Sequence, residues 1–214
     1  MLRAPQAYPG FGGDLGRSYN ATTMETLLEA AAGGDAQAQY ELALLYDNAE
    51  GDGRDAAEAA RWYLRAAEQG HADAQLHLGL MYDTGDGVEE QAGTAAEWYR
   101  RAAGQGNADA QVNLGLMYLN GTGVLKDDAA ALGCFRMAAN LGHPKAQFNL
   151  GALLYNGVAG DPPLAEIYQW WTLAALQGHP AARQNLETLG VRLSREELAA
   201  AQSAVAAAIR RQGL

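Results

Sequence analysis

The chain has 214 residues, of which 49% are hydrophobic and 19% charged, with a single cysteine, Cys134, and no run of 18 apolar residues. This composition excludes extensive disorder, an internal disulfide and a membrane-spanning helix, and it predicts a reducing, cytoplasmic location. The formal net charge of −10 lies within residues 35–110, where fifteen acidic side chains face five basic ones, so no basic stripe exists and no nucleic-acid partner is expected.

The N-terminal segment, residues 1–21, is rich in glycine and proline and is predicted to be a flexible arm. It has no apolar stretch of the kind found in secretory signals, so no such signal is expected. Thr22-Thr23-Met24-Glu25 has the sequence of a capping box, which predicts a helix from Thr22 to Ala32. Residues 22–34 would then cover the N-terminal end of the folded domain.

From residue 35 onward the sequence repeats every 36 residues. The same step separates the closing glycines, an Ala-Gln pair, a leucine and an Ala-Ala pair; the glycines are Gly34, Gly70, Gly106, Gly142 and Gly178. A unit of this size cannot bury its apolar faces alone, so the units must stack. The predicted units are 35–70, 71–106, 107–142 and 143–178, with a degenerate capping unit over 179–214, all in one repeat domain, 22–214.

Each unit is predicted to contain two helices, here called helix A and helix B. In the second unit, Leu78 and Met81 lie on one face of helix A, and the turn 85–88 ends it with two glycines. Gly79 and its equivalents, Gly115 and Gly151, would let helix B approach closely. Cys134 aligns with tryptophans of the other units and is interpreted as a buried core residue.

Histidines and acidic residues do not form a convincing metal site. His71, His143 and His179 each follow a closing glycine, so they are interpreted as N-cap residues of the next helix A. The acidic segment 47–58 lacks the ligand spacing of a calcium-binding loop. No nucleotide-binding or nucleophile motif occurs. We therefore expect no enzymatic activity, no cofactor and no metal.

The C-terminal part differs from the repeats. Residues 180–189 are predicted to be a worn helix A, and Ser194-Arg195-Glu196-Glu197 is a second capping box that predicts a last helix to about Arg211. We expect this end of the chain to cover the fourth unit through four apolar side chains: Val191, Leu198, Val205 and Ile209. Two arginines, Arg210 and Arg211, replace the paired alanines, which argues against a further stacked unit.

The repeat pattern resembles the Sel-one-like repeat family, a branch of the tetratricopeptide-like (TPR-like) α-solenoids. The resemblance rests on an A-x-x-x-L-G-x-x-Y helix, a G-x-G-V turn and a W-x-x-x-A-A-x-x-G helix, and it covers roughly residues 35–178. It implies an all-α, right-handed α-solenoid of 36-residue helix-turn-helix repeats. It also implies a scaffold or adaptor. Some secreted members carry a disulfide in each repeat and have been linked to penicillin binding, but this chain lacks those cysteines.

A second apolar stripe runs along helix A, about half a turn from the core face, and acidic or polar residues flank it. In TPR-like arrays the corresponding face lines the concave groove. The stripe is therefore either a groove for a partner or packing between neighbouring A helices, and the sequence leaves both open. The candidate partner-binding residues are Tyr40, Leu44, Asp47, Asp73, Leu76, Leu80, Asp83, Asp109, Val112, Leu116, Asn120, Phe148 and Tyr155.

The expected function is a non-enzymatic protein-protein interaction scaffold that binds a partner protein or peptide on the concave helix A face. The acidic half favours a partner with basic residues between apolar ones. One alternative is an accessory or regulatory subunit of an enzyme or signalling complex. A further alternative is a hydrolase of the penicillin-binding type. The expected oligomeric state is a monomer.

Overall fold

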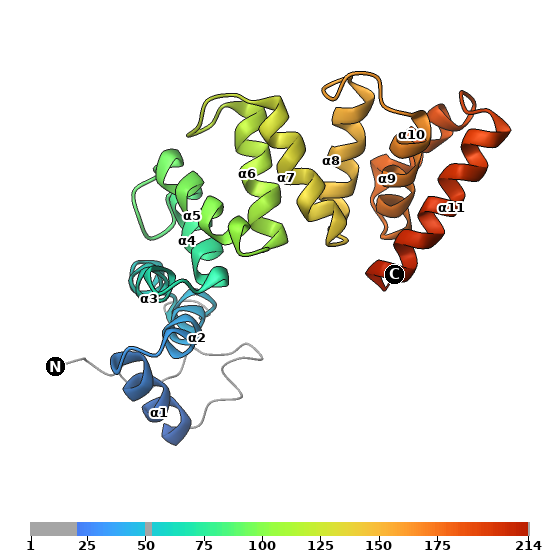
Figure 1. The fold of residues 1–214 in the computed structure, drawn as a ribbon. Coiled ribbons are helices and arrows are strands. Elements are labelled where there is room, and N and C mark those ends of the chain that lie inside the picture. The colour runs from blue at the N-terminus through green and yellow to red at the C-terminus, as the bar shows by residue number, and fades with distance from the viewer. Residues whose placement is uncertain (1–20, 50–52, 214) are drawn as a thin grey trace. The chain divides into compact units, whose positions relative to one another are not determined.

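The structure is a computed structural model that describes residues 21–49 and 53–213; the predicted arm, residues 1–21, falls almost entirely outside them. The described residues form eleven α-helices and no strand (Figure 1). Their bounds are α1 (Ala21–Ala32), α2 (Ala36–Asp47), α3 (Ala56–Glu68), α4 (Ala72–Thr84), α5 (Ala92–Gly104), α6 (Ala108–Asn120), α7 (Asp128–Asn140), α8 (Pro144–Tyr155), α9 (Leu164–Leu176), α10 (Pro180–Gly190) and α11 (Arg195–Gln212).

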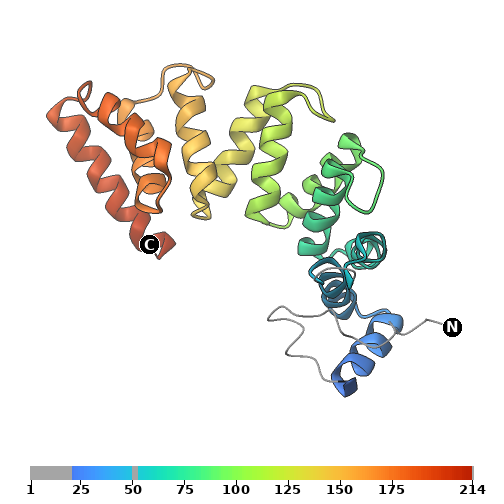
Figure 2. The same ribbon diagram turned by 180° about the vertical axis from the view of Figure 1, so that it is seen from behind.

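The helices pack as successive hairpins, which Figures 1 and 2 show from opposite sides. Helix A and helix B of the four repeats are α2 and α3, α4 and α5, α6 and α7, and α8 and α9, and each pair is in extensive contact. The expected fold class, an all-α solenoid of helix-turn-helix repeats, is confirmed. The first predicted helix is present as α1, which begins at Ala21 and ends at Ala32 as expected.

The chain divides into two compact units, residues 1–105 (unit 1) and 106–214 (unit 2). Unit 1 has a core that contains Leu42, Tyr63 and Leu78, and the core of unit 2 contains Phe135 and Leu150. The two units also differ in net charge. Unit 1 has 17 acidic and 7 basic residues, whereas unit 2 has eight of each and is neutral.

The N-caps of the A helices are side chains at the residue after each closing glycine. The Nδ1 atoms of His71 and His143 accept hydrogen bonds from the backbone N–H three residues on, at 3.2 and 3.3 Å. Asp35 and Asn107 do the same through oxygen. The capping role is thus confirmed for two histidines. His179 also stands at the N-cap position, that of α10, but its side chain makes no cap bond and its ring stacks on Phe148 with centroids 4.2 Å apart.

Glycines in the middle of three A helices allow helix B to approach. A Cβ at Gly79 would lie 2.7 Å from the Tyr99 ring, and a Cβ at Gly151 would lie 2.6 Å from the Trp171 ring. Such contacts are shorter than van der Waals packing permits, so the predicted reason for these glycines is confirmed. Cys134 is also buried as predicted, with 6% of its surface exposed.

The repeated Ala-Gln pair has a role that the sequence did not reveal. Its glutamines are buried, and the Nε2 atoms of Gln39, Gln75 and Gln147 donate to the carbonyl oxygen eight residues earlier. The Oε1 atom of Gln147 accepts from Gln177 at 2.9 Å, and its Nε2 donates to Gln212 of α11 at 3.1 Å. Each glutamine thereby fixes the step from one repeat to the next within its unit.

The last helix, α11, packs against α9. Val205 and Ala208 are buried there, with Ile209 partly buried against the same core, and the capping box at Ser194 is present. These contacts confirm that α11 covers the fourth repeat. Val191 was wrongly included, because it follows α10 in the connecting turn and is 86% exposed.

Candidate partner-binding surface

Each A helix presents a row of three side chains at positions i, i+3 and i+7, which we call the outer row. A helix places such residues on one face. The outer rows are Glu41-Leu44-Asn48, His77-Leu80-Thr84, Asn113-Leu116-Asn120, Asn149-Ala152-Asn156 and, on and just after α10, Asn185-Thr188-Arg192. Three of the middle residues, Leu44, Leu80 and Leu116, belong to the apolar stripe that was predicted from the sequence.

The predicted stripe separates into packed and exposed positions. Leu76 and Val112 are 9% and 4% exposed, so they act as packing residues. Leu80 and Leu116, one turn further along α4 and α6, are 38% and 39% exposed. Leu76 and Val112 thus pack within the fold, whereas Leu80 and Leu116 of the outer rows remain exposed.

Tyr40 is held within unit 1 by other aromatic rings. Its ring stacks on His71 with centroids 4.4 Å apart and lies 5.9 Å from His77, which stacks in turn on Tyr63 at 5.0 Å. Burial, with a smaller effect of the Asp73 charge, raises the pKa of Tyr40. Its ring is thus largely committed to packing between α2 and α4.

The predicted acidic edge is partly engaged inside the chain. Asp47 accepts from the Arg54 guanidinium at 2.8 Å and from the Tyr63 hydroxyl at 3.4 Å. Arg54 also pairs with Asp86 in the turn of the next repeat, and this hydrogen bond lowers the pKa of Asp86. Asp83 is exposed, although the Tyr99 hydroxyl lies 3.5 Å from it.

Two further aspartates of the predicted edge, Asp73 and Asp109, are exposed on the first turns of α4 and α6. The carboxylate of Asp109 lies 3.0 Å from Nε2 of His143, the cap residue of α8. It therefore links two repeats of unit 2 and still faces solvent. Asn120 is exposed at the end of α6, and Phe148 is half-buried beneath His179.

His77 gives the surface of unit 1 a pH dependence. Burial lowers its pKa, against the opposing effects of Asp47 and Asp73. The folded state therefore favours the neutral ring, whereas in the unfolded chain the ring takes up a proton near its ordinary pKa of about 6.5. This contribution to stability is present above that pH and is lost as the pH falls below it.

We therefore expect His77→Asn to flatten the acid-side decline in stability. Asn is the residue at three equivalent positions of the chain, 113, 149 and 185, so the fold accommodates it. Urea unfolding at pH 7.5 and pH 5.5 measures the effect. The free energy of unfolding should fall less between these values for His77→Asn than for the unchanged chain, and an equal fall in both proteins would contradict the assignment.

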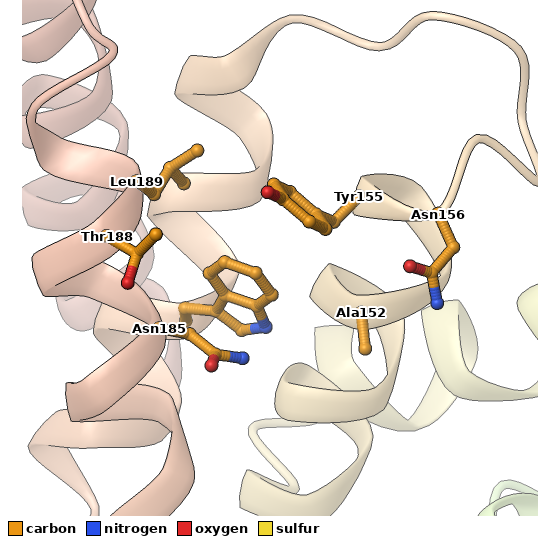
Figure 3. A pocket seen from close by; sticks show the side chains of 7 residues that line it. Ala152, Tyr155, Asn156, Asn185, Thr188 and Leu189 are labelled. Atoms are coloured by element: carbon orange, nitrogen blue, oxygen red, sulfur yellow. The ribbon is translucent and has the colours of Figure 1, made fainter.

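Unit 2 contains a pocket of about 300 Å³ between α8 and α10 (Figure 3). Tyr155 and Asn156 line it from the end of α8, Asn185 and Thr188 project into it from α10, and Trp171 of α9 forms part of its wall. Its remaining lining residues are Ala152 and Leu189. The pocket therefore combines aromatic and aliphatic surface with the hydrogen-bonding groups of Tyr155, Asn156, Asn185 and Thr188.

Tyr155 and Asn156 line both this pocket and a second hollow of about 230 Å³ at the turn between α8 and α9. The Tyr155 ring is 44% exposed and lies 5.5 Å from Trp171, centroid to centroid. The Arg192 guanidinium lies over the Tyr155 ring, 5.6 Å from its centre, and donates to the Tyr155 hydroxyl at 3.1 Å. Of the predicted site residues, Tyr155 is the one that lines this pocket.

In each repeat, the residue type at the Tyr155 position matches that of the residue 16 positions later, on helix B. In the first two repeats the pair is Asp47 with Tyr63 and Asp83 with Tyr99, and each pair has a hydroxyl–carboxylate contact. In the third repeat both residues are apolar, Leu119 and Phe135, and they belong to one core. In the fourth repeat both are aromatic, Tyr155 and Trp171.

Four lining residues were not predicted from the sequence: Trp171, Asn185, Thr188 and Leu189. Residues 180–189 were interpreted only as a worn helix A. The repeat itself could have indicated Thr188, because this residue lies 72 residues, or two repeat steps, after Leu116 of the stripe. Among the described residues, no three His, Cys, Asp or Glu side chains lie close enough to hold a metal, and no helix could span a membrane.

Comparison with known proteins identifies Sel1 repeats both in the sequence and in similar solved structures. The model of one protein family, described as Sel1 repeat, matches four segments: residues 36–71, 72–107, 108–143 and 144–179. No curated protein matches the chain. A Sel1 repeat protein from Oxalobacter formigenes has a similar solved structure, with 34% identity and a TM-score of 0.70 over 77% of this chain and 68% of that one.

A second solved structure is a protective antigen of uropathogenic Escherichia coli with an SLR fold. It is 31% identical, with a TM-score of 0.76 over 89% of this chain. This chain spans 41% of the length of that antigen.

Proposed function

Because the chain belongs to the Sel1 repeat family, as its sequence pattern indicated, we propose that it is a non-enzymatic scaffold that binds a partner protein on the helix A faces of its repeats. Sel1 repeats are generally protein-interaction modules. The single cysteine fits a cytoplasmic location, which is part of the proposal.

The observation that carries this proposal is the exposure of the outer row. Leu80 and Leu116 stand at equivalent places in successive repeats and remain more than one-third exposed, although the other leucines of their helices are largely covered. Apolar side chains that are exposed at a repeating position supply contact area for a partner. Asp73 and Asp83 flank Leu80 and would favour basic residues on that partner.

The proposal is tested by capturing a partner from a lysate with the tagged chain, identifying it by mass spectrometry and measuring its affinity. Leu80→Ser with Leu116→Ser should weaken binding about tenfold or more, since buried interface leucines contribute about 1 kcal/mol or more each. Because both leucines are partly exposed, the melting temperature should change by only a few degrees.

Leu125→Ser is the matched control, because Leu125 is 90% exposed in the turn between α6 and α7, away from the outer rows. It should leave affinity unchanged. A double variant that binds the partner as tightly as the unchanged chain, but melts at a much lower temperature, would show that the two leucines serve packing and would refute the proposal.

A further inference from the structure

Three departures from the repeat pattern meet at the second hollow, beside Tyr155. Tyr155 stands where the first two repeats have an aspartate and the third has a leucine, and Arg192 stands where the four earlier outer rows end in Asn or Thr. In the turn, residues 156–163, the positive-φ glycines Gly157 and Gly160 are three residues apart, whereas those of the second and third repeats are two apart. The hollow therefore belongs to the fourth repeat alone.

Aliphatic side chains form part of the lining of the second hollow. Leu154 and Ile167 are 1% and 2% exposed, and Pro162 and Leu164 are half-buried beside them. Its volume of about 230 Å³ is smaller than the ~300–1,000 Å³ typical of pockets for drug-sized ligands. The hollow thus suits a small molecule that has an aliphatic part.

The guanidinium of Arg192 lines the same hollow and is held at two points. It lies over the ring of Tyr155 and donates to the hydroxyl of that residue at 3.1 Å. This one bond leaves most of the guanidinium N–H donors for a ligand. A group that is already held in place loses little freedom on binding, and the planar guanidinium matches the two oxygens of a carboxylate.

A carboxylate completes the charged lining of the second hollow. Asp161 is exposed there, and among the lining residues only Asp161 and Arg192 are charged. The ion pairs of the described residues include neither of them. Two opposite charges that line one small hollow without pairing match a small ligand that carries both charges itself.

We propose that the second hollow binds a free α-amino acid with an aliphatic side chain. Its carboxylate bonds to Arg192, its ammonium group pairs with Asp161, and its side chain lies against Leu154 and Ile167. This inference goes beyond the proposed function, because it adds a small-molecule site to unit 2 and uses neither of the two exposed leucines of the outer rows.

Ligands with only one of the two charges distinguish this site from a general anion or cation site. N-acetyl-leucine keeps the carboxylate and has no ammonium group, so it leaves Asp161 without a partner and beside a like charge. Leucine amide keeps the ammonium group and leaves Arg192 without a partner. Each should bind about tenfold more weakly than leucine, because charge-assisted hydrogen bonds are among the strong ones.

The experiment adds leucine to the isotope-labelled full chain at up to about 10 mM, a range that detects weak binding, and follows the backbone amide signals by NMR. The amides of Gly157 and Gly160 line the hollow and should shift in a saturable way. Gly133 of α7 is not among the lining residues, so its signal should stay in place. Leucine should bind about tenfold more tightly than glycine, because its side chain buries apolar surface.

Variants of the two charged residues test their roles. Arg192→Gln should weaken leucine binding about tenfold, and Asp161→Asn about fivefold. Arg183→Gln and Glu187→Gln are the matched controls, because both residues are exposed on α10 and neither lines the hollow, so they should leave the affinity unchanged. All four side chains are exposed, so each variant should melt within a few degrees of the unchanged chain.

Several results would overturn the inference. They are the absence of a saturable shift at the two glycines with leucine, isoleucine, valine and methionine, equal affinity for leucine and N-acetyl-leucine or leucine amide, and full leucine affinity in Arg192→Gln or Asp161→Asn. A captured partner that requires Leu80 and Leu116, in a chain that binds no amino acid, would refute this inference alone. Amino-acid binding, together with a partner that ignores the two leucines, would refute only the proposed function.

Discussion

Deleting α11 is expected to cost unit 2 on the order of 5 kcal/mol of its free energy of unfolding. The deletion uncovers the surface of α9 on which Val205 and Ala208 pack, and it removes Gln212 from its hydrogen bonds with Gln147 and with the carbonyl of Ala139. Burial of a valine contributes about 1.5–3 kcal/mol, and buried glutamines left without partners add to the cost. Since domains are stable by about 5–15 kcal/mol, this loss is severe.

Thermal unfolding followed by circular dichroism measures this loss. The chain that ends after residue 194 should show a separate, earlier transition for unit 2, while unit 1 keeps its own core. A chain that ends after residue 211 loses Gln212 but keeps Val205, so it should lose only about 1–2 kcal/mol. Equal melting curves for the two truncated chains would contradict the packing of α11 on α9.

Gly151→Ala is expected to destabilise unit 2 by about 1–3 kcal/mol, even though alanine is the better helix former. The new Cβ would lie 2.6 Å from the ring of Trp171, whose Nε1 donates to the carbonyl of Phe148 at 3.2 Å. The ring would have to move, and it is 3% exposed and surrounded by core. Urea unfolding of the variant measures the loss.

Gly133→Ala is the matched control for this substitution. Gly133 lies inside α7, is exposed, and a Cβ there would meet no atom within 4 Å. The change should therefore stabilise the chain by about 0.5–1 kcal/mol through helix propensity alone. If Gly151→Ala also stabilised the chain, α8 and α9 could not be as close as the structure shows.

The helices and their pairing could be predicted from sequence because the evidence for them is local and repeated. The closing glycines, the glycine turn at 85–88 and the helical spacing of Leu78 and Met81 occur several times in one register. A cap at His179 could not be excluded, because the same residue type at the same position caps α4 and α8. Stacking does not explain the difference, because His71 stacks on Tyr40, the equivalent of Phe148, and still caps α4.

The candidate surface could be predicted only in part. Helical periodicity placed Leu76 and Leu80 on one stripe, but whether a side chain on that stripe is covered depends on neighbours distant in sequence. The pocket at Tyr155 depends on α10, where the apolar pattern is weakest. Asp47 was predicted to face a partner, yet its contacts come from Tyr63 and Arg54, and helical periodicity says nothing of contacts across a turn.

The pairing of positions 16 residues apart restricts how this array can change its length. A duplication or deletion whose breakpoints lie at the closing glycines keeps each pair intact, such as Asp83 with Tyr99 or Tyr155 with Trp171. A breakpoint in the turn between helix A and helix B would produce hybrids in which a carboxylate faces Phe135, or in which Leu119 faces a tyrosine hydroxyl. The viable unit of genetic exchange is therefore the whole repeat, and hybrid arrays made by swapping single helices should fold poorly.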